Sequence, residues 1–553
     1  MKLDICKCIT ASWAAWSFTL AGCGYAPDMS RRPPSEFALA PAKPAETQAT
    51  VAADVQPEAE PTSHLQDSGG RPWIEVAKLP YEYWEVLYLE RKRIGFSHVL
   101  VEPSKSMGAA KLRISRRSVL EVARAGQRVR QELVVESIED ADGSLRTLTE
   151  TQRAGKQHTE TSGSVFNGKL KLTERDLAQP TNPQKSIAEI ATPDGVWGPM
   201  GIQQILLRRP MQPKDRYAAV VFVELLHQFA KVELLAGQWE DTPVGTDSLA
   251  KLLPIDVTLQ AGSNMLKTRN WINVNGEVIK SVLLTGWNLQ TFRATREVAQ
   301  RIDSESLVDL VTTTAIPIEG LKQDPHQASQ TVYRIDANDV DPFGLISPRS
   351  NQTLHSITAR SAEVTVYQIR PTSSLAKEIE LDPPTDACRT ASTVIQSDDP
   401  LIERLAIDLV GQSQQPVEIA AKLTRGVFER ISKKNFSREF ASAREVAQAL
   451  EGDCTEHSVL LVALLRNRGI PARIASGLVY TNSQPQPSMA YHMWVEAWLN
   501  QRWLPLDATT GGLIGTGHIK FLESPLDGGN PYVALLPVMT QFSNLKLQVL
   551  SSR

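Results

Sequence analysis

The chain has 553 residues, more than one hydrophobic core normally serves, so we expect two or three domains. Its 59 basic and 62 acidic side chains give a formal net charge of −3, which leaves no basic excess to favour nucleic-acid binding. The sequence has no nucleotide-binding loop, no Cys/His spacing typical of a metal site and no internal repeat. We therefore predict no cofactor, no metal and no nucleic-acid partner.

The N-terminus has the pattern of an export signal. Lys2 and Lys7 precede an apolar stretch over 9–20, too short to span a bilayer, and Leu-Ala-Gly-Cys follows at 20–23. This quartet resembles the lipobox of bacterial lipoproteins, which implies removal of residues 1–22 and lipidation of Cys23. An ordinary secretory signal is the alternative, and it too implies export. By the same resemblance, Gly24 after the cysteine favours a lipid anchor in the outer membrane, facing the periplasm.

Residues 23–72 are rich in Pro, Ala, Glu and Ser and lack the apolar periodicity of a folded domain. This composition is typical of a disordered tether. Such a tether behind an acylated cysteine lets a domain stand off the membrane. The membrane, reached through the N-terminal lipid anchor, is therefore one expected partner.

A β-rich domain is predicted over 73–320. Alternating segments flank a charged turn at 90–93, an Asp-Gly pair at 142–143 and an Asn-Gly pair at 275–276, which predicts hairpins in one or two twisted antiparallel sheets. Residues 321–390 are assigned to a β-rich extension or linker subdomain. We expect the β-rich region as a whole to bind substrate or a protein partner in the envelope. Trp197 and Trp287 are candidates for a binding face, and the other interpretation is that both lie in the buried core.

Helices are predicted to open the next domain, 391–530. Asp399-Pro400 is typical of an N-cap followed by a first helical residue, and Ile419, Leu423, Val427 and Ile431 recur every fourth position. Ser442 with Glu445 forms a capping box that predicts a further short helix.

Cys454 stands where the next helix should begin. Asp453 is a good N-cap residue, Glu456 completes a capping box, and an apolar run over 459–465 follows. The positive end of the helix dipole favours the thiolate, and free backbone N–H groups there can stabilise an oxyanion. A buried structural cysteine is the alternative interpretation.

Two further segments supply an imidazole and a carboxylate. His492 lies in an alternating strand, and Asp507 lies in the returning strand after a turn at Asn500-Gln501. A two-residue loop puts His492 opposite Thr509 and diagonal to Asp507, whereas a four-residue loop puts His492 directly opposite Asp507. Both registers leave the two side chains on one face, close enough to meet. His457, one helical turn after the cysteine, and His518, after a Gly-rich stretch, are the competing histidines.

These segments resemble the core of the transglutaminase-like superfamily of cysteine enzymes. The matching motifs are Gly-Asp-Cys at 452–454, Leu-Leu-Arg at 464–466, Gly-Ile-Pro-Ala-Arg at 469–473, His-Met-Trp-Val-Glu at 492–496 and Trp-Leu-Pro-Leu-Asp at 503–507. The resemblance covers roughly 400–530, with His-Met-Trp where His-Ala-Trp is usual. It implies an α+β, papain-like fold for this domain. Together with the β-rich region before it, the expected chain is multidomain, with a mostly antiparallel β region first, this domain next and residues 531–553 as a C-terminal tail.

The same resemblance implies a catalytic triad of Cys454, His492 and Asp507. The predicted function is an exported cysteine-dependent acyl-transfer enzyme that acts on protein or peptide amide bonds through a thioester, as a peptidase, an amidase or a transglutaminase. The alternative is a catalytically silent binding or scaffold lipoprotein of the cell envelope. Of five cysteines, only Cys388 and Cys454 would remain after processing and lipidation, so no disulfide framework is expected.

Overall fold

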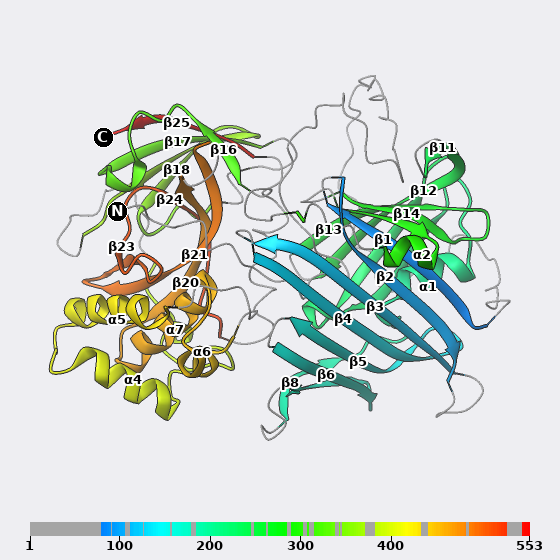
Figure 1. Cartoon of the computed structure of the whole chain (residues 1–553), viewed down its shortest axis with the longest axis horizontal. Coiled ribbons are helices and arrows are strands. Elements are labelled where there is room, and N and C mark those ends of the chain that lie inside the picture. Colours follow the sequence, from blue (N-terminus) through cyan, green and yellow to red (C-terminus); the bar gives the residue numbers. More distant parts are fainter. Residues whose placement is uncertain are drawn as a thin grey trace, which may run out of the picture.

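The computed structural model describes residues 79–89, 91–104, 111–124, 127–154, 157–177, 184–244, 248–261, 264–284, 289–301, 307–308, 315–337, 342, 346–370, 382–432, 441–482, 486–527 and 545–553. The predicted signal, the lipidation site at Cys23 and the tether lie outside these residues. Within them the chain forms two sheets and a group of helices (Figure 1). No helix in the described ranges is both long and apolar enough to cross a membrane.

The first sheet is antiparallel throughout its described pairings and contains fifteen strands. In chain order they are β1 (Tyr81–Leu89), β2 (Lys92–Pro103), β3 (Lys111–Arg124), β4 (Gln127–Asp140), β5 (Leu145–Ala154), β6 (Gln157–Phe166), β7 (Lys169–Asp176), β8 (Lys185–Ala191), β9 (Arg216–Val223), β10 (Gln228–Ala236), β11 (Glu240–Pro243), β12 (Leu249–Ala261), β13 (Asn264–Ile272), β14 (Val278–Leu283) and β15 (Leu289–Ala294). Two short helices, α1 (Gly201–Arg208) and α2 (Arg296–Gln300), accompany it.

Strands β1 to β8 follow one another as a meander. Strand β1 also pairs with β15, so the last strand of this sheet in the sequence lies beside the first. The three predicted hairpins are present as β1–β2, β4–β5 and β13–β14. Two of their turns carry a glycine with positive φ, Gly143 at +93° and Gly276 at +77°, a conformation that glycine adopts without steric cost.

Trp197 links two distant parts of this sheet. It forms isolated bridges to Ser144, at the β4–β5 turn, and to Val221 in β9, and its carbonyl accepts a hydrogen bond from Phe222 N at 2.9 Å. The side chain is buried, with 4 % exposed, which agrees with a core role. Trp287 lies outside the described residues.

The second sheet contains ten described strands: β16 (Ile316–Glu319), β17 (Gln330–Ala337), β18 (Gln352–Thr358), β19 (Ser361–Tyr367), β20 (Ala472–Thr481), β21 (Ser488–Leu499), β22 (Arg502–Asp507), β23 (Gly512–Leu513), β24 (His518–Ser524) and β25 (Leu545–Ser552). Its main path is β18-β19-β17-β25-β16-β21-β20-β24, with β22 beside β21 and β23 beside β22.

This sheet does not follow the domain boundaries expected from the sequence. Strand β16 precedes the expected boundary at 320 and pairs with β21 and β25. Strands β17–β19 belong to the same sheet as β20 and β21, not to a separate extension. The segment expected as a tail contributes β25, which pairs with β16 and β17. Strand pairing over long sequence distances decides these boundaries, and composition does not reveal it.

Helices α4 (Pro400–Val410), α5 (Pro416–Arg430), α6 (Ala443–Ala449) and α7 (Cys454–Asn467) precede β20, as the caps and periodicity predict. Helix α7 is buried from Cys454 to Arg466 and packs against the other three helices and against β20 and β21 (Figure 1). Leu87 of β1 and Ile94 of β2 share a hydrophobic cluster with Leu461 of α7. The first sheet and the helices therefore share one core.

Candidate active site

Cys454 is the first residue of α7, and the helix begins with the predicted capping box. Oδ1 of Asp453 accepts a hydrogen bond from Thr455 N at 2.7 Å, and Oε2 of Glu456 accepts one from Asp453 N at 3.0 Å. Burial raises the pKa of Glu456 above its usual range, against the hydrogen bonds that the carboxylate accepts. The exposed fraction of Cys454 is 0 %, so the thiol lies inside the protein at the positive end of a buried helix dipole.

Gly452 shapes the entry to this helix. Its φ is +145°, which L side chains rarely adopt, and a Cβ built on it would lie 2.4 Å from Cβ of Glu456. Glu456 is therefore able to reach back to the Asp453 backbone only because position 452 has no side chain.

His492 and Asp507 meet across the β21–β22 hairpin. Asn500 and Gln501, with φ of +51° and +59°, form a two-residue turn, and Leu499 pairs with Arg502. This is the diagonal register of the two that the sequence allows. Nε2 of His492 lies 2.9 Å from Oδ2 of Asp507, and both side chains are buried.

Asp507 is held by its neighbours as well. Its Oδ1 accepts hydrogen bonds from Thr509 N at 2.8 Å and from Thr509 Oγ1 at 2.6 Å, which leaves Oδ2 for the imidazole. Burial acts to raise the pKa of Asp507, but the charge and hydrogen bond of His492, with a contribution from His518, hold it well below its usual range. Asp507 is therefore a carboxylate that fixes His492.

Because Nε2 of His492 faces Asp507, Nδ1 is the ring nitrogen left for another partner. Nδ1 is buried and has no hydrogen-bond partner among the described residues. Strand β21 packs along α7, and Cys454 is among the charges that act on Tyr491, the residue before His492. The residues expected for a cysteine, histidine and carboxylate site thus come from α7, β21 and β22.

Residues 403–508 match the family model of the transglutaminase-like superfamily. The match includes Cys454, His492 and Asp507 and all four helices except the first three residues of α4. No curated protein matches the chain in sequence.

Two solved structures resemble the chain weakly. A "putative cysteine protease" from Cytophaga hutchinsonii is 17 % identical, with 41 % of this chain and 86 % of that chain covered and a TM-score of 0.25. A "putative protease" from Parabacteroides distasonis is 11 % identical, with 64 % of each chain covered and a TM-score of 0.17. Likenesses at these scores carry no argument about this chain.

His518 lies closer to the site than the sequence indicated. It begins β24, just beyond the residues that match the transglutaminase-like model, and it is buried. Its Nε2 is 3.4 Å from Oδ2 of Asp507, and its ring lies 5.5 Å from that of His492. Burial lowers the pKa of His518 to about 4. The alternation of His518 and Lys520 with apolar residues after Gly517 was the signal for a strand here.

His457, the other competing histidine, interacts within its own helix. Its Nδ1 lies 2.6 Å from the carbonyl oxygen of Asp453, one turn earlier. This is the local contact that the helical spacing predicts.

A buried ionic network lies beside these residues in the transglutaminase-like domain. Oε1 of Glu496 is 2.9 Å from Nζ of Lys520, and Oε2 is 2.8 Å from Nε of Arg473. Burial alone would raise the pKa of Glu496, but the two cations lower it below its usual range. The network ties β20, β21 and β24 together on the face that carries His492.

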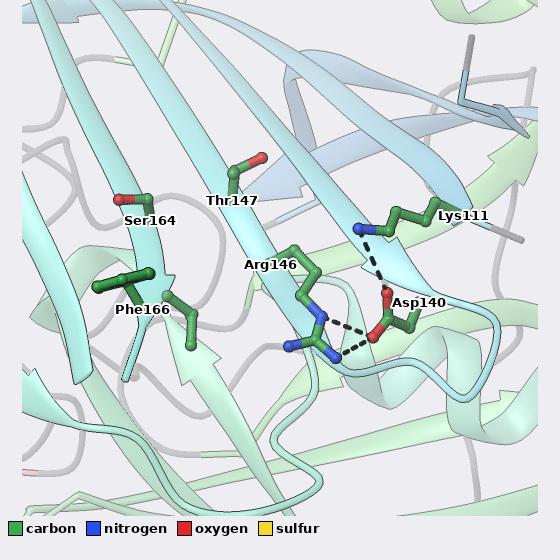
Figure 2. A pocket seen from close by; sticks show the side chains of 7 residues that line it. Lys111, Asp140, Arg146, Thr147, Ser164 and Phe166 are labelled. Carbon is green, nitrogen blue, oxygen red and sulfur yellow. Dashed lines mark hydrogen bonds and ion pairs between the residues drawn. The ribbon is translucent and has the colours of Figure 1, made fainter. Parts of the chain in front are cut away.

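Cys388 and Cys454, the two described cysteines, are both buried, and neither forms a disulfide among the described residues. A separate hollow of about 650 Å³ lies on the first sheet (Figure 2). It is lined by Lys111, Asp140, Arg146, Thr147, Ser164, Val165 and Phe166. Arg146 and Lys111 both pair with Asp140, and no lining residue belongs to the second sheet, so the hollow is distinct from the Cys454 site.

Proposed function

We propose that the chain is an exported, lipid-anchored cysteine enzyme that performs acyl transfer at amide bonds of proteins or peptides. The observation that carries the proposal is the 2.9 Å contact between His492 Nε2 and Asp507 Oδ2, which leaves the buried Nδ1 for a thiol. Cys454 lies at the start of α7, where a thiolate is favoured. The transglutaminase-like match over 403–508 supports an enzyme without fixing its reaction.

In the proposed reaction, His492 Nδ1 takes the proton of the Cys454 thiol, and the thiolate attacks the amide carbon. Backbone N–H groups at the start of α7 stabilise the oxyanion. His492 returns the proton to the leaving amine as the C–N bond breaks, which leaves a thioester. Water then gives hydrolysis, or a second amine gives transamidation. Asp507 stays ionised throughout and holds the imidazole.

Export and anchoring through Cys23 are part of the same proposal and have their support in the sequence alone. Residues 23–72 act as the tether, and the first sheet binds substrate or an envelope protein. The reaction would then occur at the outer membrane, on the periplasmic side.

One observation favours the alternative, a catalytically silent binding or scaffold lipoprotein. Because 0 % of Cys454 is exposed, a substrate carbonyl reaches the thiol only after a neighbouring segment moves. If no such motion occurs, the fold serves as a binding module.

The rate of Cys454 alkylation by iodoacetamide, measured against pH, separates the two functions. An activated thiol reacts with a midpoint well below pH 8.5, the ordinary value for cysteine, whereas a silent site gives an ordinary midpoint or no reaction. Cys388→Ala is the matched control, because it leaves Cys454 as the one described thiol.

The substrate is identified by incubating envelope extract with wild type or Cys454→Ala and analysing the peptides by mass spectrometry. New termini indicate a peptidase, mass losses at side-chain amides indicate an amidase, and crosslinked peptides indicate a transglutaminase. Identical peptide patterns with the two proteins would contradict the enzyme proposal.

A further inference from the structure

Three metal-ligand atoms converge beside the thiol site. They are Nε2 of His492 on β21, Oδ2 of Asp507 at the end of β22 and Nε2 of His518 at the start of β24. Asp507 Oδ2 lies 2.9 Å from the first nitrogen and 3.4 Å from the second, and one ligand atom from each residue lies within 4.8 Å of the others. All three residues are at least 98 % buried.

His518 has no role in the proposed acyl transfer, yet its Nε2 faces Oδ2 of Asp507. Both of its ring nitrogens are buried: among the described residues, Nδ1 has no hydrogen-bond partner, and Nε2 has only the long contact of 3.4 Å to Asp507 Oδ2. A buried imidazole in this state loses the hydrogen bonds it made in water. An ion bound between the two imidazoles would satisfy its Nε2.

The spacing suits a small divalent transition metal. Zinc binds imidazole nitrogen and carboxylate oxygen at about 2.0–2.2 Å in tetrahedral geometry, so neighbouring ligand atoms lie roughly 3.3–3.5 Å apart. The observed 2.9 and 3.4 Å differ from this by a few tenths of an ångström, and the two imidazoles need to approach by at most about 1.5 Å. Two histidines and one carboxylate are a ligand set that zinc commonly takes, with the fourth position left open.

We propose that His492, Asp507 and His518 form a binding site for Zn²⁺, and that the bound ion blocks the thiol chemistry. Binding requires the lone pair of His492 Nε2, so the proton now on Nε2 moves to Nδ1. With Nδ1 protonated, His492 can no longer accept the proton of Cys454. The inhibitory effect rests on the proposed function, whereas zinc binding itself does not.

The surroundings predict a reversible site of moderate affinity. Thr509 donates two hydrogen bonds to Oδ1 of Asp507, which orients Oδ2 toward the imidazoles. Nδ1 of His492 and Nδ1 of His518 have no partner among the described residues. Because the loss of such partners typically weakens metal binding 10–100-fold, we expect a Kd in the micromolar range, so that occupancy follows the zinc supply.

Binding is tested on the full chain, made without a histidine tag, by titration with Zn²⁺ in a calorimeter and with Co²⁺ by visible absorption. We expect one ion per wild-type chain and at least tenfold weaker binding for His518→Ala. His326→Ala is the matched control, because its ring lies 5.5 Å from His518 but is not a ligand. Equal affinity of wild type and His518→Ala, or no binding to wild type, would overturn the proposal. Circular dichroism shows whether each variant is folded.

Two further measurements separate this proposal from the proposed function. Cys454→Ala should bind Co²⁺ as wild type does, because the thiol is not one of the ligands; a large loss of affinity would contradict the assigned site. Zn²⁺ should slow Cys454 alkylation in wild type more than in His518→Ala, and EDTA should restore the rate. If Zn²⁺ leaves the alkylation rate unchanged, the proposed inhibition is refuted. If Cys454 does not react under any condition, the acyl-transfer function is refuted, and the Co²⁺ titration alone then tests whether the metal site exists.

Discussion

Gly452 and Glu456 pack so closely that no side chain fits between them. A Cβ on Gly452 would lie 2.4 Å from Cβ and 2.5 Å from Cγ of Glu456. We therefore expect Gly452→Ala to displace Glu456, break the capping box at Cys454 and lower the free energy of unfolding by about 3 kcal/mol, from backbone strain plus overpacking. Urea unfolding measures this loss, and the alkylation rate of Cys454 should fall with it.

Gly469→Ala is the matched control for this change. Gly469 also has a positive φ, +75°, but a Cβ there meets nothing within 4 Å. Its substitution should cost only the backbone strain, about 1 kcal/mol. Equal losses for the two variants would show that the contact with Glu456 does not matter.

Asp507→Asn should leave the fold intact and disable His492. The Asn carbonyl can still accept the two Thr509 hydrogen bonds, which turns its NH₂ toward Nε2 of His492. Nε2 must then accept, so the proton moves to Nδ1 and the thiol loses its base. We expect roughly a 10³-fold loss in turnover or in Cys454 alkylation at neutral pH. Asp336→Asn, at a partly exposed ion pair with Arg334, should leave the rate unchanged.

His518 makes the stability of the protein depend on pH. Burial lowers its pKa to about 4, whereas the unfolded chain has a value near 6.5. Between these values the unfolded state binds a proton that the folded state does not, so the free energy of unfolding falls as pH falls from 6.5 to 4, by at most about 3 kcal/mol. The stability that the ionised Asp507 contributes is lost only at still lower pH, because its folded pKa is well below its usual range.

This dependence is measured by urea unfolding at several pH values. His518→Gln should flatten the curve between pH 6.5 and 4, while the same change at the exposed His355 should not. A slope that survives in His518→Gln would assign the pH dependence to other groups.

Replacing only one partner of the Glu496–Lys520 ion pair should destabilise the fold. Both side chains are fully buried, and Glu496 also pairs with Arg473. Glu496→Gln removes the buried carboxylate that Arg473 and Lys520 share and leaves each cation with a more exposed acidic partner, Asp382 for Arg473 and Glu523 for Lys520. It should destabilise the fold by about 3 kcal/mol. Lys520→Met should cost less, because Glu496 keeps Arg473. Thermal unfolding of the single and double variants tests this: in the double variant the loss should be smaller than the sum.

Much of the site could be predicted because its signals are local. A cap residue and a glutamate three positions later place Cys454 at a helix start, and these contacts form within one turn. Alternation and a short polar turn place His492 and Asp507 on one face, whatever even loop length joins their strands. The choice between the registers depended on Asn500 and Gln501 both taking a positive φ, a conformation that glycine adopts without steric cost but that glutamine rarely adopts.

The parts that the sequence did not reveal depend on distant partners. His518 enters the site because β24 pairs with β20, which brings a residue after a Gly-rich stretch next to Asp507. The place of β16 and β25 in the sheet has the same cause, since β16 pairs with β21 and β25, and β25 also pairs with β17. Tertiary pairing of this kind leaves little trace in composition or periodicity.

Strand β25 lies between β16 and β17, and Ser329 hydrogen-bonds with Arg553 across 224 positions of sequence. During synthesis, the helix that carries Cys454 and the strands that carry His492 and Asp507 therefore emerge before the strand that joins the two halves of their sheet. Until residues 545–552 arrive, β16 and β17 present open edges on which other chains can pair. Strand pairings between residues so far apart in sequence form slowly, so the chain needs protection from aggregation most before residues 545–552 have emerged.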